Sequence, residues 1–146
     1  MLYTIGHGAT TVDDLLRRLE SHGVRMVLDV RSQPYSRHPQ FNKAELEAEL
    51  AADGIGYRWL GVHLGGKPLR PGAAAPVDDP VLLEAGITEA AGLAAGATGA
   101  LLCAELDPVH CHRATVLAPR FAAARFTVMH IYADGTAAPH QPSLDV

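Results

Sequence analysis

Cysteine, lysine and long apolar runs are all scarce in this sequence. Its 146 residues include two cysteines, one tryptophan and 12 basic residues, of which only two are lysines. A chain of this length can bury a core without disulfide or metal staples. In a cytoplasmic chain, two cysteines are more often reduced, metal-bound or reactive than joined in a structural disulfide. We therefore expect Cys103 and Cys111 not to form a structural disulfide.

The shortage of apolar runs excludes a membrane-spanning helix. No stretch reaches the roughly 20 apolar residues that a span requires. The N-terminal sequence MLYTIGHG also lacks the basic flank and long apolar core of a signal peptide. We expect a cytoplasmic protein without a membrane partner.

Positive charge is also limited, because the formal net charge is −4. Such a chain has no general attraction to nucleic acid, so any polyanion site must come from a local group of arginines. Single-stranded nucleic acid could still stack on Tyr35, Tyr57 and Trp59 beside Arg37 and Arg58. The sequence leaves that possibility open.

The composition that remains is globular, with 48% hydrophobic and 19% charged residues. Five apolar runs read as strands, over residues 2–5, 25–30, 55–60, 99–104 and 126–132. Continuous apolar runs separated by helical segments predict an α/β fold, with a mainly parallel sheet of about five strands and helices on both faces. This is a Rossmann-like three-layer sandwich. We expect one domain over residues 1–134 and a polar tail over residues 135–146.

Start and stop signals place the helices between these strands. Thr11 is a typical N-cap, and Asn42 with Glu45 resembles a capping box. Pro119 must break or kink the last helix. Residues 61–78 are rich in glycine and proline without periodicity, which predicts a long binding loop, lid or mobile segment.

Polar or glycine-containing stretches follow four of the predicted strands. In parallel sheets, ligands bind outside the carboxyl ends of the strands, so these stretches should face one crevice. Asp29 and Glu105 would transfer protons there, and His7 would orient or protonate a substrate. These three residues and Cys111 are our candidate catalytic residues.

A second group of residues is suited to binding an anion. Arginine grips oxyanions with a planar fork, and hydroxyl and glycine-rich segments supply further donors. The pair of glycines before Lys67 lacks the spacing of a phosphate loop. The candidate ligand-binding residues are Arg31, Ser36, Arg37, Gly65, Gly66 and Arg113.

The stretch LLCAELDPVHCHR, over residues 101–113, contains both cysteines. Cys103 ends a strand, where a thiol commonly serves for packing. Cys111 comes where a helix begins, and free N–H groups there favour a thiolate or a bound anion. A zinc site formed by Cys103, Cys111, His112 and Glu105 would have a C-x₇-C-H spacing that matches none of the usual ligand pairs. We therefore expect no metal and no cofactor.

Several blocks of this sequence together resemble one known family. The blocks lie at Tyr3–His7, at Leu28–Arg31 with Pro34, Ser36 and Arg37, at Phe41–Lys43, at Leu64–Gly66, and at Leu102–Glu105 with Cys111–Arg113. In this order they resemble the domain of unknown function 488 family, from residue 3 to about residue 118. The resemblance implies a compact α/β domain and no established reaction. The family often has serine where this chain has Gly8, so no hydroxyl role is expected at that position.

Three classes of function remain. The leading hypothesis is a hydrolase or transferase acting on a phosphate-bearing or nucleotide-like ligand. The partner would thus be a small anionic or nucleotide-like ligand, which Arg31, Arg37 and Arg113 would clamp. The second is thiol chemistry of the rhodanese or cysteine-phosphatase kind, although nine residues separate Cys103 from Arg113 instead of five. The third is a non-catalytic module that binds nucleotides or single-stranded nucleic acid. A homodimer is compatible with all three.

Overall fold

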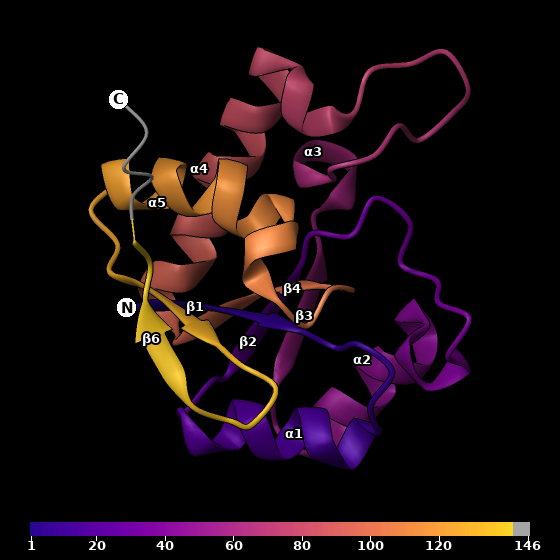
Figure 1. Cartoon of the computed structure of the whole chain (residues 1–146), viewed down its shortest axis with the longest axis vertical. Coiled ribbons are helices and arrows are strands. Elements are labelled where there is room, and N and C mark those ends of the chain that lie inside the picture. Colours follow the sequence, from indigo (N-terminus) through magenta and orange to yellow (C-terminus); the bar gives the residue numbers. More distant parts are fainter. Residues whose placement is uncertain (142–146) are drawn as a thin grey trace.

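A six-stranded sheet forms the centre of the molecule (Figure 1). The computed structural model describes residues 1–141, and the strands lie side by side in the order β3-β2-β4-β1-β5-β6. All neighbouring strands are parallel except β5 and β6. The strands are β1 (Leu2–Gly6), β2 (Met26–Asp29), β3 (Gly56–Trp59), β4 (Gly99–Cys103), β5 (Val128–Ile131) and β6 (Ala137–Pro139). The prediction of a mainly parallel α/β sheet is confirmed.

Helices connect the parallel strands. Five α-helices are described: α1 (Val12–Ser21), α2 (Lys43–Ala52), α3 (Gly61–Leu64), α4 (Pro80–Gly96) and α5 (Ala118–Ala123). One π-helical turn, Arg113–Leu117, leads directly into α5. The sequence predicted a break or kink in this helix at Pro119. Pro119 is the second residue of α5, just after the change from π-helical to α-helical geometry. Proline lacks the N–H that a continuous α-helix would use there.

The two faces of the sheet are covered by different helices (Figure 1). Leucines of α1 and α2 pack with Val27 and Leu102 on one face. Side chains of α4 and α5 pack with Leu28 and Leu101 on the other. Successive strand residues point to opposite faces, so the continuous apolar runs supply both cores. The expected three layers are present.

Two helix starts behave differently from one another. The Thr11 side chain accepts a hydrogen bond from the Asp14 amide at 3.1 Å, as its N-cap role predicts. The predicted capping box at Asn42 is wrong, because its side chain makes no cap hydrogen bond. Asn42 Oδ1 instead accepts from the Ser36 amide at 2.7 Å and holds the preceding loop.

The sheet has one strand more than predicted. β6, at Ala137–Pro139, pairs antiparallel with β5 inside the segment expected to be a polar tail. Residues 142–146 of that predicted tail lie outside the described residues. The segment 61–78 also contains helix α3 and a 3-10 turn, Pro76–Asp78, which the sequence did not predict. Both missed elements are three or four residues long, too short to show a period.

The chain reverses direction across the sheet between β1 and β4. From β1 the chain passes through α1 to β2 on one side, whereas from β4 it passes through α5 to β5 on the other. β1 and β4 are neighbours, and Gly6 lies opposite Cys103 at their carboxyl ends. Such a switch point opens a crevice outside the strand ends. The topology therefore places the candidate site at the residues that follow Gly6 and Cys103.

Candidate functional site

A pocket of about 530 Å³ opens at this switch point. It is bordered by the residues that follow β1, β2 and β4, together with parts of the 61–78 segment. Its lining includes His7, Arg31, Ser32, Ser36, Gly66, Lys67, Cys103, Glu105, Cys111 and His112. Of the ten predicted site residues, six line this pocket: His7, Arg31, Ser36, Gly66, Glu105 and Cys111. The crevice expected from the strand ends thus contains most of the predicted residues.

His7 is held rigidly at the end of β1. Its Nδ1 donates to the Gly8 carbonyl at 2.7 Å, and its ring stacks on Phe41 at 4.4 Å between centroids. Burial lowers the pKa of His7 to about 4. The imidazole is therefore neutral near pH 7, with Nε2 available as an acceptor 3.4 Å from Arg31 Nη1.

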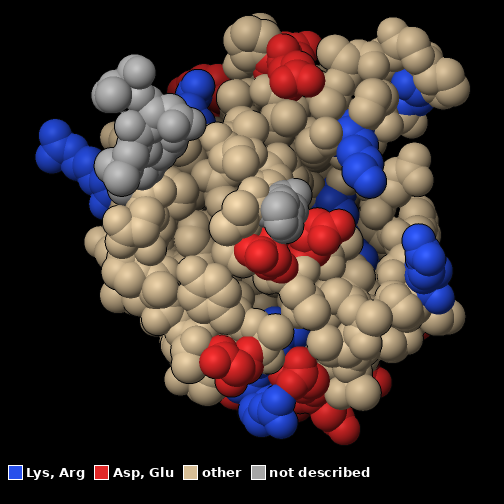
Figure 2. Space-filling view, in the orientation of Figure 1, with Lys and Arg blue, Asp and Glu red and all other residues tan. Residues whose placement is uncertain are grey.

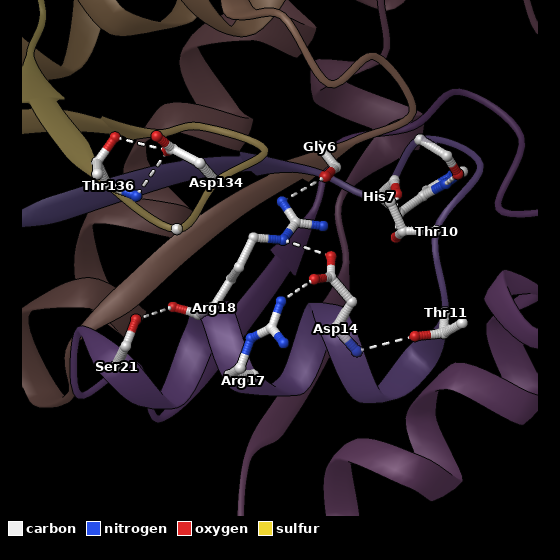
Figure 3. A network of polar contacts seen from close by, with 12 residues as sticks. Gly6, His7, Thr10, Thr11, Asp14, Arg17, Arg18, Ser21, Asp134 and Thr136 are labelled. Carbon is white, nitrogen blue, oxygen red and sulfur yellow. Dashed lines mark hydrogen bonds and ion pairs between the residues drawn. The ribbon is translucent and has the colours of Figure 1, made fainter.

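Helix α1 supports the same strand end from below (Figure 3). The buried Arg18 donates from Nη1 to the Gly6 carbonyl at 3.0 Å and from Nε to Asp14 at 2.9 Å. Thr10 Oγ1 donates to the His7 carbonyl at 2.6 Å. A side chain at Gly6 would collide with the Glu105 carbonyl, since a Cβ there would lie 1.6 Å from that oxygen. Gly6 therefore lets the β1 and β4 ends approach closely.

Asp29 and Arg31 form a closed pair at the end of β2. Arg31 donates from Nε and Nη2 to the two Asp29 oxygens at 2.9 and 2.8 Å, and from Nη1 to the Phe41 carbonyl at 2.8 Å. Tyr57 donates its hydroxyl to Asp29 at 2.5 Å. Burial alone would lower the pKa of Arg31, but the bonds to Asp29 outweigh it and raise that pKa. Burial also raises the pKa of Tyr57, and the Asp29 charge adds to this rise.

This pairing limits what either residue can do in the pocket. Asp29 is fully buried and does not line it. Arg31 does line the pocket, but most of its donors are already used by protein acceptors. The pair fixes the polar floor of the site, and the proton-transfer role expected for Asp29 has no access to a ligand in this arrangement.

Arg113 lies behind the pocket instead of in it. It is fully buried, and its Nη1 and Nη2 donate to the carbonyls of Glu105 and Leu106 at 2.5 and 2.9 Å. Nη1 also lies 3.3 Å from Cys103 Sγ. Burial lowers the pKa of Arg113 to about 10. The anion clamp predicted for Arg113 has no support here, because its donors hold the loop that follows β4.

The two cysteines are joined. Their sulfurs form a disulfide between the end of β4 and the residue before the π-helical turn. The sequence favoured reduced, metal-bound or reactive cysteines over a structural disulfide, whereas the structure joins Cys103 and Cys111. A 3-10 turn, Pro108–His110, reverses the chain between them and brings the two ends of the loop together. Both sulfur-bearing residues line the pocket, so the disulfide is part of its wall.

His112 stands next to this disulfide. Its Nε2 is 3.0 Å from the Leu64 carbonyl, and its Nδ1 is 3.6 Å from Cys111 Sγ. A carbonyl oxygen can only accept, so Nε2 carries the proton and Nδ1 presents a lone pair toward the sulfur. Burial lowers the pKa of His112, which favours this neutral form.

The remaining predicted residues divide between the pocket and the surface. Glu105 is exposed at the pocket edge, and Ser36 lines the pocket. Gly66 also lines it and lies against His112, since a Cβ there would be 2.8 Å from that ring. Gly65 packs against Ser32 outside the lining, and Arg37 is exposed away from it.

Sequence reasoning missed several pocket residues. Cys103, His112, Lys67 and Ser32 all line the site but were not among the ten predicted residues. Ser32 Oγ donates to the Lys67 carbonyl and accepts from the Lys67 amide, both at 2.8 Å. This reciprocal contact joins the β2 end to the 61–78 segment. The Cys-His sequence at 111–112 was the available signal for His112.

The aromatic residues considered for nucleic-acid stacking are mostly occupied. Tyr57 and Trp59 direct their polar atoms inward, to Asp29 and to the Arg31 carbonyl. Tyr35 is exposed. Figure 2 shows acidic groups near the centre of one face and basic groups along its right edge, not a continuous basic surface. Nucleic-acid binding remains a prediction with little support from this face.

One family model matches most of the chain. A family model described as "Domain of unknown function DUF488" matches residues 11–118. The chain belongs to the DUF488 family. The match confirms the resemblance seen in the sequence blocks, although the first block, Tyr3–His7, lies before the matched region. No curated protein and no solved structure matches this DUF488 protein.

No described helix of this protein meets the requirements of a membrane span. Over residues 1–141, none combines the length and the apolar character needed to cross a bilayer. This agrees with the scarcity of apolar runs in the sequence.

Proposed function

We propose that this DUF488 protein is a thiol-dependent enzyme whose Cys103–Cys111 pair exchanges between disulfide and dithiol forms with a small thiol bound in the pocket. The observation that carries the proposal is the position of the disulfide: it borders the pocket at the sheet's switch point. In the reducing cytoplasm that we expect for this chain, a disulfide is usually catalytic or redox-sensing. A purely structural cystine would not need this position.

The contacts around the two sulfurs suggest their separate roles. Arg113 Nη1 lies 3.3 Å from Cys103 Sγ and can stabilise negative charge on it. Cys103 is therefore the better leaving group, and Cys111 is the sulfur that an incoming thiolate attacks. This retains the catalytic role predicted for Cys111.

The exchange balances in two steps. A substrate thiolate bonds to Cys111 Sγ, the Cys103–Cys111 bond breaks, and the electron pair stays on Cys103 Sγ. A second substrate thiolate then bonds to the substrate sulfur of this mixed disulfide, which releases Cys111 as a thiolate. Two substrate thiols are oxidised to one disulfide, and the enzyme disulfide is reduced to two thiols.

The hydrolase or transferase hypothesis with a phosphate-bearing ligand receives less support. Arg113 and Arg37 do not line the pocket, and Arg31 is paired with Asp29. Lys67 and Ser36 do line it, so an anionic ligand still suits the site. We therefore expect the thiol substrate to carry an acidic group.

Glutathione, an acidic thiol, provides the test. The protein is equilibrated in mixtures of reduced and oxidised glutathione, and its free thiols are then alkylated. Mass spectrometry gives the number of alkylated thiols per chain. We expect reversible conversion of one disulfide per chain at a potential above about −300 mV, the region where exchangeable disulfides lie. A Cys103→Ser variant should accumulate a glutathione adduct on Cys111, because the thiol that resolves the adduct is missing.

The matched variant is Cys111→Ser, which should form less adduct, because the Arg113 hydrogen bond makes Cys103 a weaker nucleophile and a better leaving group. A native pair that stays oxidised in reduced glutathione would identify a structural cystine and refute the proposal. Equal trapping on both single-cysteine variants would refute the assigned roles.

A further inference from the structure

Three metal-ligating atoms come together at the pocket wall. Cys103 Sγ, Cys111 Sγ and one ring nitrogen of His112 all lie within 4.8 Å of one another. We propose that the reduced form of the protein binds a zinc-type divalent metal ion through the two thiolates and His112 Nδ1. This inference goes beyond the proposed exchange reaction, and it requires only that the disulfide can be reduced.

The distance between Cys111 and His112 already suits such an ion. Tetrahedral zinc with a Zn–S bond of about 2.3 Å and a Zn–N bond of about 2.05 Å places the sulfur and nitrogen about 3.6 Å apart. The Cys111 Sγ to His112 Nδ1 distance is 3.6 Å. One edge of the coordination tetrahedron therefore exists without any rearrangement.

The tautomer of His112 is also fixed for ligation. Its Nε2–H donates to the Leu64 carbonyl at 3.0 Å, which leaves the Nδ1 lone pair on the sulfur side. Metal-binding histidines almost always donate their second ring N–H to a carbonyl, carboxylate or water. Leu64 belongs to the short helix α3, so this helix has a direct role in orienting the ring.

The cysteine backbones leave room for separated sulfurs. Their Cα atoms are 7.5 Å apart, whereas disulfides usually span about 4.4–6.8 Å. Two thiolates on one zinc ion would lie about 3.8 Å apart, from the same tetrahedral geometry. Opening the disulfide moves the sulfurs toward that spacing and requires no closer approach of the backbone.

The surrounding charges balance the ion. Two thiolates neutralise a divalent cation, and Arg113 Nη1 can donate a hydrogen bond to the ligating Cys103 sulfur. Three protein ligands would leave a fourth position for a further ligand, and all three ligand residues line the pocket. An open fourth position is the arrangement of catalytic zinc sites, in which water or substrate completes the coordination.

The sequence argued against a metal because C-x₇-C-H is not a usual spacing. That argument assumes that the loop itself sets the ligand positions. Here β4 fixes Cys103, while the 3-10 turn and the π-helical turn fix Cys111 and His112. The supporting framework, not a short motif, brings the ligands together.

Cobalt(II) is the probe that tests this site. The intact protein is reduced with a phosphine, its thiols are counted, and cobalt is titrated in without oxygen. We expect one cobalt per chain, with intense near-ultraviolet thiolate-to-cobalt absorption and visible bands typical of tetrahedral cobalt. Zinc should displace the cobalt and remove both sets of bands.

Variants of two histidines identify the nitrogen ligand. His112→Gln should weaken cobalt binding by more than the roughly 10–100-fold that loss of an outer-shell partner costs. His22→Gln, whose ring contacts the Gly135 carbonyl far along the chain, should bind as the parent does. Unchanged cobalt affinity in His112→Gln would overturn the assignment of that ligand.

Oxidation of the unmodified protein supplies a test that needs no variant. Diamide takes two electrons and two protons from the thiols to form the disulfide, and we expect it to release one bound zinc per chain to a coloured chelator. Zinc that stays bound after oxidation would refute thiolate ligation. Folded protein that has two counted thiols but no cobalt spectrum would refute the metal site. The glutathione exchange is measured without metal, so that result would leave the proposed function to be decided by its own experiment.

Discussion

Two arginines are buried after neighbouring strands, and the protein neutralises only one of them. Arg31, after β2, has a carboxylate partner in Asp29 at 2.8 Å. Arg113, after β4, donates to carbonyl groups and contacts a sulfur, with no carboxylate within ion-pair distance among residues 1–141. Their pKa values accordingly move in opposite directions, upward for Arg31 and downward for Arg113.

The difference separates a structural charge from a functional one. The Arg31 charge is cancelled within the floor of the pocket, so it contributes shape and rigidity. The Arg113 charge is not cancelled by a bonded partner, and it acts on the atom that it touches, Cys103 Sγ. Both proposals for this site use that contact, the first to stabilise a leaving group and the second as a hydrogen bond to a metal ligand.

Asp29→Asn should have the largest effect on stability. The substitution keeps the size of the side chain but leaves the Arg31 charge buried without its partner. Breaking a buried pair in this way costs about 3–5 kcal/mol of unfolding free energy. Urea denaturation measures the loss, and Asp13→Asn, at an exposed position in the first turn of α1, is the matched control. A cost equal to that of the control would show that Arg31 finds a substitute partner.

Arg113→Gln should cost less than Asp29→Asn, although it also removes one charge. It loses hydrogen bonds from a charged donor to the Glu105 and Leu106 carbonyls, worth about 1.5–3 kcal/mol each. It also removes a buried charge that has no bonded carboxylate, which offsets part of the loss. We expect a net cost of about 1.5–3 kcal/mol in the same urea experiment.

Arg113→Lys sharpens the comparison. Lysine keeps the buried charge but cannot reach both carbonyls with a planar fork. We expect this variant to be at least as unstable as Arg113→Gln. An arginine whose role is to clamp a ligand would instead tolerate lysine with near-normal stability, so a stable lysine variant would restore the clamp hypothesis.

The sequence predicted the parallel sheet because its strands are continuous apolar runs. It did not predict β6, since Ala137–Pro139 has only three residues and is too short to show a period. The sequence also predicted that His7, Arg31 and Glu105 face one crevice, because each follows the carboxyl end of a parallel strand. It could not tell which side chains reach the crevice: Arg113 and Glu105 are eight positions apart, yet Arg113 is fully buried and Glu105 is exposed.

The disulfide was missed for a related reason. The sequence prediction rested on how cysteines usually behave in cytoplasmic proteins. Whether two particular cysteines pair depends instead on where the backbone places their sulfurs. The turn Pro108–His110 decides that placement. Its aspartate cap, Asp107, accepts from the Val109 amide at 3.0 Å. The sequence therefore contained the signals for this turn. That the turn brings Cys111 next to Cys103 could be seen only once the position of β4 was known.

The smallest expected effect concerns His130, where the Arg113 charge acts at a distance. His130 is buried in β5 between Thr4 and His140, with its Nδ1 2.5 Å from the Thr4 hydroxyl and its Nε2 2.9 Å from His140 Nδ1. Burial lowers its pKa from 6.5 to about 4, and repulsion from His140 and then Arg113 adds to the shift. Between these two pH values His130 is protonated in the unfolded chain but stays neutral in the folded chain. The contribution of His130 to the unfolding free energy is therefore complete above pH 6.5 and is lost as the pH drops toward 4.

Arg113→Gln should reduce this acid sensitivity. Without the guanidinium charge, the folded-state pKa of His130 lies closer to its unfolded value, so the loss of unfolding free energy on acidification becomes smaller. Imidazole proton signals followed by NMR give the pKa of His130 in both proteins, and urea denaturation at neutral and acidic pH gives the stability. If the His130 pKa is the same with and without Arg113, the charge behind the pocket is screened more strongly than its burial implies, and its influence on Cys103 would then rest on the hydrogen bond alone.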